Sequence, residues 1–213
     1  SCGVNVPDDM CGDAVGSVSY VTCDGVLLGG LCFGDRVREG AADSVSELHG
    51  LGVEKTVMLT GDREAPASRI CEEVGIDTLH AGLLPQEKLD CLHELRQDYR
   101  VLAVGDGIND ALALREADVG IAMGAMGSDL AIQSADIALM NNNLGNIPFA
   151  IKLARRTRRV VYQNLALSIG ISAVMIALSA FGVISALAGS VLHNCGAFAV
   201  LINSSKLLRM NEK

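Results

Sequence analysis

The chain has 213 residues, half of them hydrophobic, with seven Phe or Tyr residues and no Trp. This apolar fraction supports a buried core and excludes a disordered chain. The formal net charge of −8 is uneven, because residues 155–213 carry seven basic and one acidic side chain, whereas residues 1–154 carry ten basic and 24 acidic ones. The acidic first part excludes nucleic acid as its main partner, since a phosphate backbone is bound by basic side chains.

Strand and helix patterns follow one another along the first part of the chain. Two β-rich runs flank Asp24-Gly25, a dipeptide typical of hairpin turns. After them, short apolar runs alternate with stretches of helical periodicity, which predicts an α/β fold with a parallel, Rossmann-like sheet covered by helices on both faces. The predicted strands are 17–23, 26–33, 55–59, 78–79, 100–104, 119–122 and 136–139, and the predicted helices are 38–49, 66–74, 85–97 and 109–116, with one more between the last two strands.

A long apolar stretch fills the second part of the chain. Residues 162–205 contain no Asp, Glu, Lys or Arg in 44 positions. Since a membrane-spanning helix needs about 20 apolar residues, this stretch predicts a hairpin of two spans, which we place at 165–181 and 187–208. Four Arg residues precede the first span, and three basic residues, Lys206, Arg209 and Lys213, lie at or after the end of the second, so the positive-inside rule predicts that both ends lie in the cytoplasm. A buried helical hairpin in a soluble protein is the alternative.

The seven cysteines are scattered, and none belongs to a Cys-x-x-Cys pair. This spacing excludes a zinc-finger or thioredoxin-like site. Six of the cysteines precede the apolar stretch, where we expect reduced thiols in a cytosolic domain.

Two polar loops follow predicted strands, at the edge where a parallel sheet carries its reactive groups. The run Gly105-Asp106-Gly107-Ile108-Asn109-Asp110 places two carboxylates four residues apart in a tight turn. Such a turn suits Mg²⁺, which prefers oxygen ligands and usually takes one or two protein carboxylates. A turn in which Asp106 and Asp110 only cap a helix is the alternative.

The other loop and the helix after it offer groups for phosphate. Thr60 supplies a hydroxyl for a phosphoryl oxygen, Gly61 permits close backbone approach, and Asp62 is then free to contact nucleotide or water. Lys88 lies in the first turn of the helix that Pro85 opens, where it brings a positive charge to a phosphoryl group. Phosphoryl transfer needs mainly positioning and charge neutralisation, which these groups and a carboxylate-bound Mg²⁺ supply.

Five motifs occur in order along the chain: Met58-Leu59-Thr60-Gly61-Asp62, Pro85-Gln86-Glu87-Lys88, Val104-Gly105-Asp106-Gly107-Ile108-Asn109-Asp110, Ala117-Asp118-Val119-Gly120-Ile121-Ala122-Met123-Gly124 and Ala135-Asp136-Ile137-Ala138-Leu139. This set resembles the signature motifs of P-type ATPases, which are members of the haloacid dehalogenase-like superfamily, and the resemblance covers roughly residues 17–210. It implies that Thr60 and Lys88 contact the phosphoryl group, with Gly61 and Asp62 beside them. It also implies that Asp106 binds Mg²⁺ with support from Asp110. The nucleotide is then ATP, and the residues assigned to its site are Asp35, Arg38 and Asn109.

The family's Asp-Lys-Thr-Gly-Thr motif, which holds the phosphorylated Asp, does not occur in this sequence. We therefore expect a C-terminal fragment: 1–16 as the tail of a missing upstream region, 17–150 as the C-terminal half of the phosphorylation domain, and 151–213 as the last two transmembrane helices. The fragment is expected to be inactive alone and to work with the missing N-terminal part of the same pump in the plasma membrane. Two alternatives stay open, a membrane-anchored phosphatase of the same superfamily and a non-catalytic half-pump with a regulatory role.

Three polar residues, His193, Asn194 and Cys195, interrupt the second span. Polar side chains at such a depth are costly and usually face a pathway or a partner, and imidazole and thiol bind borderline or soft metals. The alternative is that His193 lies near the membrane surface and that Cys195 packs as a small apolar residue.

The segment Asn203-Ser204-Ser205-Lys206-Leu207-Leu208-Arg209 resembles the end of heavy-metal-translocating P-type ATPases, which implies a transition-metal cation as cargo. The Lys and Asp of zinc- and cadmium-type members are replaced here by Ser172 and Asn194, and the Tyr-Asn pair and the Met and Ser ligands of copper-type members are not evident. A His-centred motif resembles members proposed for manganese, cobalt or iron. Manganese, cobalt, iron, zinc and cadmium therefore all stay open as the transported metal.

Overall fold

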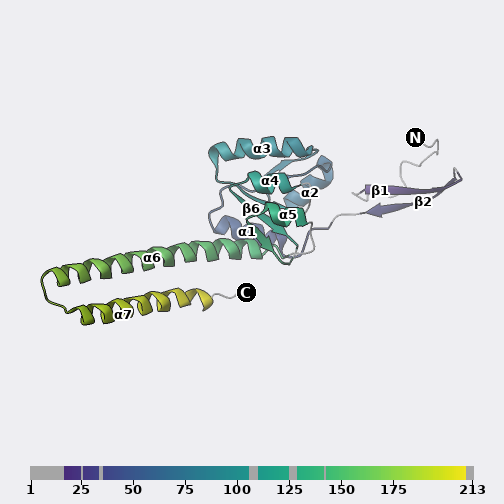
Figure 1. Ribbon diagram of the computed structural model, residues 1–213. Coiled ribbons are helices and arrows are strands. Elements are labelled where there is room, and N and C mark those ends of the chain that lie inside the picture. The colour runs from purple at the N-terminus through teal and green to yellow at the C-terminus, as the bar shows by residue number, and fades with distance from the viewer. Residues whose placement is uncertain are drawn as a thin grey trace. The chain divides into compact units, whose positions relative to one another are not determined.

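The computed structural model describes residues 17–24, 26–33, 36–105, 110–124, 129–141 and 143–209. The chain divides into two compact units, Ser1–Gly145 and Asn146–Lys213 (Figure 1). The elements are β1 (Ser17–Cys23), β2 (Val26–Phe33), α1 (Ala41–Gly50), β3 (Val57–Leu59), α2 (Glu64–Val74), β4 (Thr78–His80), α3 (Pro85–Asp98), β5 (Leu102–Gly105), α4 (Ala111–Glu116), β6 (Val119–Met123), α5 (Asp129–Ser134), β7 (Ile137–Leu139), α6 (Asn146–Ala180), α7 (Ala186–Ser205) and the 3-10 helix η2 (Lys206–Arg209).

The predicted hairpin is confirmed in β1 and β2, which pair antiparallel from Ser17 opposite Phe33 to Cys23 opposite Val26. Asp24, in the connecting turn, has a left-handed φ of 49°. Asp tolerates this conformation because its short polar side chain can hydrogen-bond locally.

The remaining strands pair in parallel, as their alternation with helices predicts, but they form two hydrogen-bonded groups, where the sequence predicts one sheet. β3 pairs with β4, and β6 lies between β5 and β7. The strand predicted at 55–59 is shorter in the structure. The Thr56 N–H donates to the Asp77 carboxylate at 2.7 Å, so regular pairing begins at Val57, which lies opposite Thr78.

Short helices pack closely on the three-stranded sheet. Leu114 of α4 and Ala122 of β6 form a buried core. A Cβ atom at Gly120 would overlap the main-chain carbonyl of Leu114, so glycine at this position lets α4 lie directly against β6. This packing fixes the start of α4 beside the carboxyl end of β5, where the candidate site lies.

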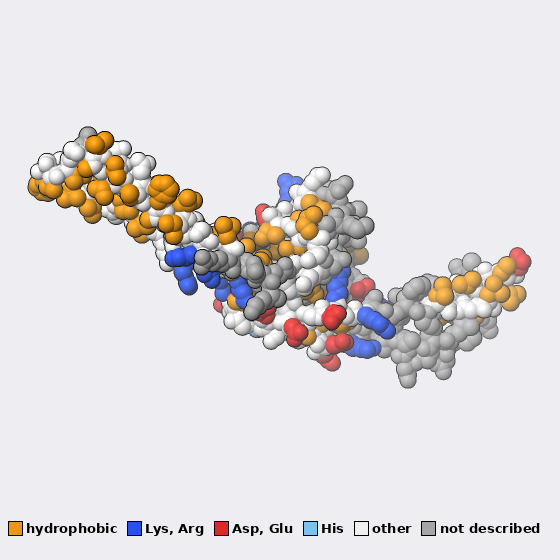
Figure 2. All heavy atoms as spheres, turned by 90° about the horizontal axis from the view of Figure 1, so that it is seen from below, with side chains coloured by type: hydrophobic (Ala, Val, Ile, Leu, Met, Phe, Trp, Pro, Cys, Tyr) orange, Lys and Arg blue, Asp and Glu red, His pale blue; other side chains and the backbone are white. Residues whose placement is uncertain are grey.

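The apolar stretch forms the helical hairpin of α6 and α7. Two helical segments, Asn146–Ala180 and Leu187–Leu208, are long and apolar enough to cross a membrane. In their most apolar windows only 6% and 0% of the residues are buried, and Figure 2 shows hydrophobic side chains over the hairpin surface. Within this unit, the two helices could therefore span a membrane by their length and composition.

Candidate functional site

The Thr60 loop follows β3 at its carboxyl end. The Thr60 N–H donates to the carbonyl of His80 at 3.0 Å, which extends the pairing of β3 with β4 by one residue. Thr60 Oγ1 donates to Asp62 Oδ2 at 2.9 Å and accepts from the Asp62 N–H at 3.1 Å. The hydroxyl and the carboxylate therefore hold each other, whereas the sequence interpretation left Asp62 free for nucleotide or water.

A second loop, which leads into α3, is hydrogen-bonded to the Thr60 loop. Gly82 N–H donates to the Asp62 carbonyl at 2.8 Å, and Leu83 N–H donates to the Thr60 carbonyl at 3.0 Å. A Cβ atom at Gly61 would lie 3.2 Å from the Leu83 carbonyl oxygen. The missing side chain of Gly61 thus allows the two loops to approach, and their contact places the start of α3 near the end of β3.

Lys88 and Asp110 meet between the first turn of α3 and the N-cap of α4. Pro85 is the first residue of α3. The Leu84 N–H donates to Glu87 Oε2 at 2.7 Å and so caps the start of the helix. One turn into the helix, Lys88 Nζ lies 3.1 Å from Asp110 Oδ1. Their side chains are 18% and 29% exposed, so solvent screens this ion pair less than an open surface pair.

Glycine at the end of β5 allows this geometry. A Cβ atom at Gly105 would lie 2.6 Å from Cβ of Asp110, which is closer than two such atoms can pack. Because Gly105 has no side chain, Asp110 can lie close against the carboxyl end of β5. A carboxylate oxygen is a ligand that Mg²⁺ prefers, and an ammonium group neutralises a phosphoryl oxygen. Asp110 and Lys88 therefore suit a site that holds Mg²⁺ and a phosphoryl group together.

The remaining residues predicted for this site are Asp35, Arg38, Asp106 and Asn109. Asp35, Asp106 and Asn109 lie outside the described residues. Arg38 is exposed before α1, and its carbonyl accepts from the Ala41 N–H at 3.1 Å. The structure thus joins Thr60 to Asp62 and Lys88 to Asp110, and it places all four near the carboxyl ends of β3 and β5.

Three Asp carboxylates at the opposite ends of the strands carry a role that our sequence analysis missed. Each Asp directly precedes a strand and accepts an N–H from the neighbouring strand segment, at 2.7 to 2.9 Å. The sequence signal is an Asp immediately before an extended apolar run. The pairs are Asp77 with Thr56, Asp118 with Val101 and Asp136 with Gly120.

These bonds also set the ionisation of two of the carboxylates. The N–H and hydroxyl of Thr56 lower the pKa of Asp77, and the nearby His49 and Lys55 add to this. The pKa of Asp118 is lowered by the Val101 N–H, by the hydrogen bond from Arg100 and by the charge of Arg96. In both cases the hydrogen bond favours the charged form of the carboxylate. These carboxylates therefore stabilise the sheet. They lie at the starts of strands, away from the loops that follow the strands.

Burial raises the pKa of two cysteine thiols of the first unit. Cys71 is buried in α2 and Cys91 is half-buried in α3, and burial raises the pKa of both thiols; Glu94 and Asp90 raise that of Cys91 further. A raised pKa lowers the fraction of reactive thiolate. Cys23, Cys71, Cys91 and Cys195 are free thiols.

The three candidate cargo ligands lie on α7. His193, Asn194 and Cys195 are exposed in the hairpin, and Asn194 Nδ2 donates to the Ser190 carbonyl at 2.9 Å within its own helix. Among the described residues, no group of three or more His, Cys, Asp or Glu side chains lies close enough to hold a metal ion. The exposed positions of His193 and Cys195 leave both available to groups outside this hairpin.

A polar cluster joins α6 to α7, and it was not anticipated as a contact. Asn164 Nδ2 donates to Ser204 Oγ at 2.8 Å, and Asn203 Nδ2 donates to Asn164 Oδ1 at 2.9 Å. All three side chains are half-buried. The only hint in the sequence was amide and hydroxyl residues near the two ends of the charge-free stretch.

Comparison with known proteins relates the chain to a hydrolase family and to metal-transporting ATPases. A family model described as haloacid dehalogenase-like hydrolase matches residues 5–118. The chain is 39% identical over 208 residues to a zinc-transporting ATPase of Synechocystis sp., covering 96% of this chain and 29% of that protein. It is 42% identical over 187 residues to a manganese-exporting P-type ATPase of Mycobacterium tuberculosis, covering 87% of this chain and 26% of that protein.

Solved structures give the same result. A crystal structure of a zinc-transporting PIB-type ATPase matches with a TM-score of 0.78 and 36% identity, over 92% of this chain and 32% of that one. The chain therefore spans less than a third of the length of these relatives.

Proposed function

Because this chain belongs to the haloacid dehalogenase-like hydrolase family, and its relatives include metal-transporting P-type ATPases, we propose that it forms the C-terminal part of such a pump. The pump couples ATP hydrolysis, through an aspartyl phosphate, to the export of a transition-metal cation. The observation that carries this proposal is the contact of Lys88 with Asp110 at 3.1 Å. It brings a cation and a carboxylate together at the strand ends where this family performs phosphoryl chemistry.

Each site residue has a role in this proposal. Lys88 neutralises charge on the transferred phosphoryl group, and Asp110 keeps the Lys88 ammonium in position. The Thr60 hydroxyl, which donates to Asp62 in the structure, turns its hydrogen to a phosphoryl oxygen when the phosphoryl group binds. Mg²⁺, held by Asp106 with Asp110 behind it, supplies further neutralisation when bound.

The two parts of the chain have different roles in this proposal. We assign 17–150 to the phosphorylation domain, with Asp35, Arg38 and Asn109 near the ATP, and 151–213 to a transmembrane hairpin. The pump lies in the plasma membrane with the phosphorylation domain and both hairpin ends in the cytoplasm, which the basic residues at both ends support. The acceptor Asp comes from the N-terminal part of the pump, because the sequence has no Asp-Lys-Thr-Gly-Thr motif, so this chain alone is inactive.

The cargo is a first-row or related divalent cation. His193 and Cys195 offer borderline ligands, and the neutral Asn194 between them supplies no carboxylate, so other helices provide the balancing charge. The exposed position of His193 on α7 is compatible with a ligand that faces those helices. The relatives' names include zinc and manganese, and the proposal extends to cobalt, iron and cadmium.

The test uses the full-length gene expressed in bacterial membranes. Inverted vesicles are expected to take up at least one of Mn²⁺, Zn²⁺, Co²⁺, Fe²⁺ or Cd²⁺ when ATP and Mg²⁺ are present, and to form an acid-stable, hydroxylamine-sensitive phosphoprotein. Asp106→Asn is expected to abolish both signals, and Glu72→Gln on the exposed face of α2 is expected to keep both.

Phosphate release from small phosphate esters without any metal uptake would instead identify a membrane-anchored phosphatase. Absence of both activities, with the protein correctly inserted, would leave the non-catalytic regulatory half-pump.

A further inference from the structure

Five basic residues form a band on α6 just before its apolar part. They lie within eight consecutive positions, and α6 contains no acidic residue at all. At 1.5 Å per residue the band is about 10 Å long, and all five side chains are exposed. We call this group the basic band: Lys152, Arg155, Arg156, Arg158 and Arg159.

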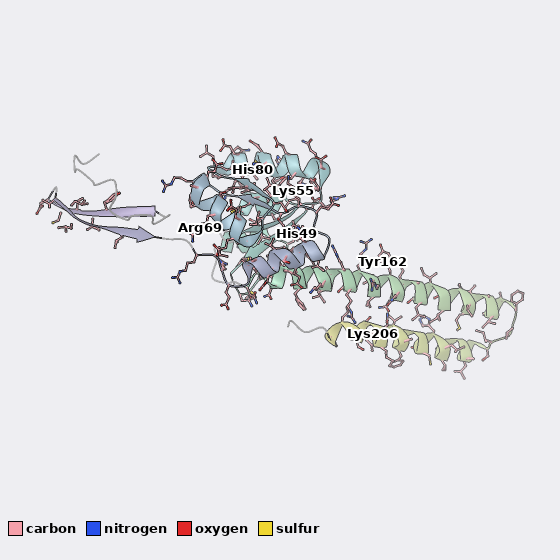
Figure 3. All side chains as sticks on the ribbon, turned by 180° about the vertical axis from the view of Figure 1, so that it is seen from behind. His49, Lys55, Arg69, His80, Tyr162 and Lys206 are labelled. Carbon is pink, nitrogen blue, oxygen red and sulfur yellow. The ribbon has the colours of Figure 1, made fainter. Side chains whose placement is uncertain are left out.

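The antiparallel packing of the hairpin adds a cation from α7 near this level. Asn164 bonds Ser204 at 2.8 Å and Asn203 at 2.9 Å, so residues just after 204 lie beside residues just before 164. Lys206 is therefore near the level of Tyr162, and Figure 3 shows the two labelled residues at the same point along the hairpin. Lys206 is exposed, and its Nζ donates to Asn203 Oδ1 at 2.9 Å.

Tyr162 marks the boundary between the basic band and the apolar part. Its ring is 60% exposed, and the Arg158 guanidinium lies 5.6 Å from the ring centroid. Tyr is enriched where lipid headgroups meet hydrocarbon, because its ring is apolar and its hydroxyl polar. With Tyr162 at that depth, the apolar residues that follow it lie in hydrocarbon and the basic band lies at the height of the headgroups.

We propose that the basic band and Lys206 bind the phosphate headgroups of anionic phospholipids in the leaflet that meets this end of the hairpin. The inference rests on the proposed insertion of the hairpin in a membrane. Arg forms bidentate hydrogen bonds with phosphate, and basic clusters beside a transmembrane helix attract anionic lipids. Both helices contribute cations near one level, so a single lipid or a few adjacent lipids bridge them.

The experiment reconstitutes the whole chain in nanodiscs of equimolar phosphatidylglycerol and phosphatidylcholine. Native mass spectrometry then counts the lipids that stay bound when the disc is released. Phosphatidylglycerol is expected to be retained over phosphatidylcholine, and added salt is expected to reduce this preference. The variant with all four Arg residues of the band changed to Gln is expected to lose about tenfold or more of the preference, and Lys206→Gln about fivefold.

A matched control removes the same number of charges from the first unit. Four exposed basic residues of that unit, of which Figure 3 labels two, are changed to Gln and are expected to leave the preference unchanged. Equal retention of both lipids by the parent, or an equal loss in the control variant, overturns the proposal. Alkaline extraction keeps the two hypotheses apart, because a chain that is extracted contradicts membrane insertion, whereas an inserted chain without lipid preference contradicts only this inference. The control positions are Arg36, Lys55, Arg69 and Arg115.

Discussion

Lys88 and Asp110, 22 residues apart in the sequence, are joined through Nζ and Oδ1 at 3.1 Å. The contact links the first turn of α3 to the N-cap of α4. Since both side chains are largely shielded from solvent, loss of either partner would leave the other charge poorly compensated. Removal of either side chain is therefore expected to disturb the candidate site.

Replacing Lys88 by Met keeps the length of the side chain and removes its charge. In the full-length pump we expect the rate of phosphoprotein formation from ATP to fall about a hundredfold, which is the usual cost of losing one charge-stabilising donor. Quenched-flow measurement with labelled ATP provides the rate. Lys55→Met, on an exposed loop before β3, is the control, and equal rates for both variants would contradict the role of Lys88.

Replacing Gly105 by Ala is expected to push α4 away from the end of β5, because the new Cβ would lie 2.6 Å from Cβ of Asp110. We expect a loss of about 1–3 kcal/mol in the free energy of unfolding, typical of overpacking. Thermal melting of the whole chain, followed by circular dichroism, provides the measurement. Gly50→Ala is the control, since a Cβ there meets nothing within 4 Å, and a Gly105→Ala variant that melts like it would contradict the packing argument.

Asp118 gives a prediction about pH. The Val101 N–H, Arg100 and Arg96 lower its pKa in the folded state, so the charged carboxylate stabilises the fold above its unfolded pKa of about 3.9. This stabilisation is lost as the pH falls through the lower, folded pKa. Asp118→Asn should therefore be less stable than the parent near neutral pH, and the difference should shrink below about pH 4.

Urea denaturation midpoints at a series of pH values test this expectation. Glu72→Gln, on the exposed surface of α2, removes one charge and controls for the change in net charge. A difference between Asp118→Asn and the parent that stays constant with pH would show that the side-chain charge is not responsible.

The amide contact between Asn164 and Asn203 predicts coupling between α6 and α7. Each single Ala variant is expected to destabilise the hairpin, and the double variant is expected to lose less than the sum, with a coupling of about 0.6–1.7 kcal/mol. Unfolding in detergent with increasing dodecyl sulfate provides the free energies. Asn194→Ala is the control, because its amide donates to the Ser190 carbonyl within its own helix, and additive effects of the pair would show that the contact is not stabilising.

His193 is predicted to be a ligand for the cargo or to orient one. In cells that carry the full-length gene, His193→Ala is expected to reduce tolerance to at least one of Mn²⁺, Co²⁺, Fe²⁺, Zn²⁺ or Cd²⁺ at unchanged protein level. Val191→Ala, an exposed residue of the same helix, is expected to keep it, and Cys195→Ala shows whether the thiol contributes. Unchanged tolerance to all five metals in His193→Ala would remove this residue from the pathway.

Much of the fold was determined by the sequence, because its signals are local. The Asp24-Gly25 dipeptide predicts the hairpin of β1 and β2, and Pro85 and Gly75 mark the start of α3 and the end of α2. The charge-free stretch predicts two long apolar helices for the same reason. Strand limits were less exact, as at Thr56, because a side chain distant in sequence takes the N–H that would extend the ladder.

Residue types and spacing also suggested the candidate site. The motifs indicate Thr60, Lys88 and Asp110, but the sequence does not say which of them are in contact. The ion pair of Lys88 with Asp110 depends on α4 lying against β6, which the missing side chain of Gly120 allows. Periodicity gives no information on such contacts. They join segments that are far apart in the sequence, and separation in the sequence does not determine distance in space.

Tertiary structure alone decided the partners of polar groups. Asp62 accepts from the Thr60 hydroxyl, Asp118 accepts from the segment before β5, and Asn164 meets Asn203 across the hairpin. A carboxylate or amide has several acceptor and donor positions, and its type is compatible with a ligand, a cap or a strand contact alike. Sequence therefore determined which chemistry this protein carries, and three-dimensional packing determined which groups are free to perform it, because only close approach selects one hydrogen-bond partner among many.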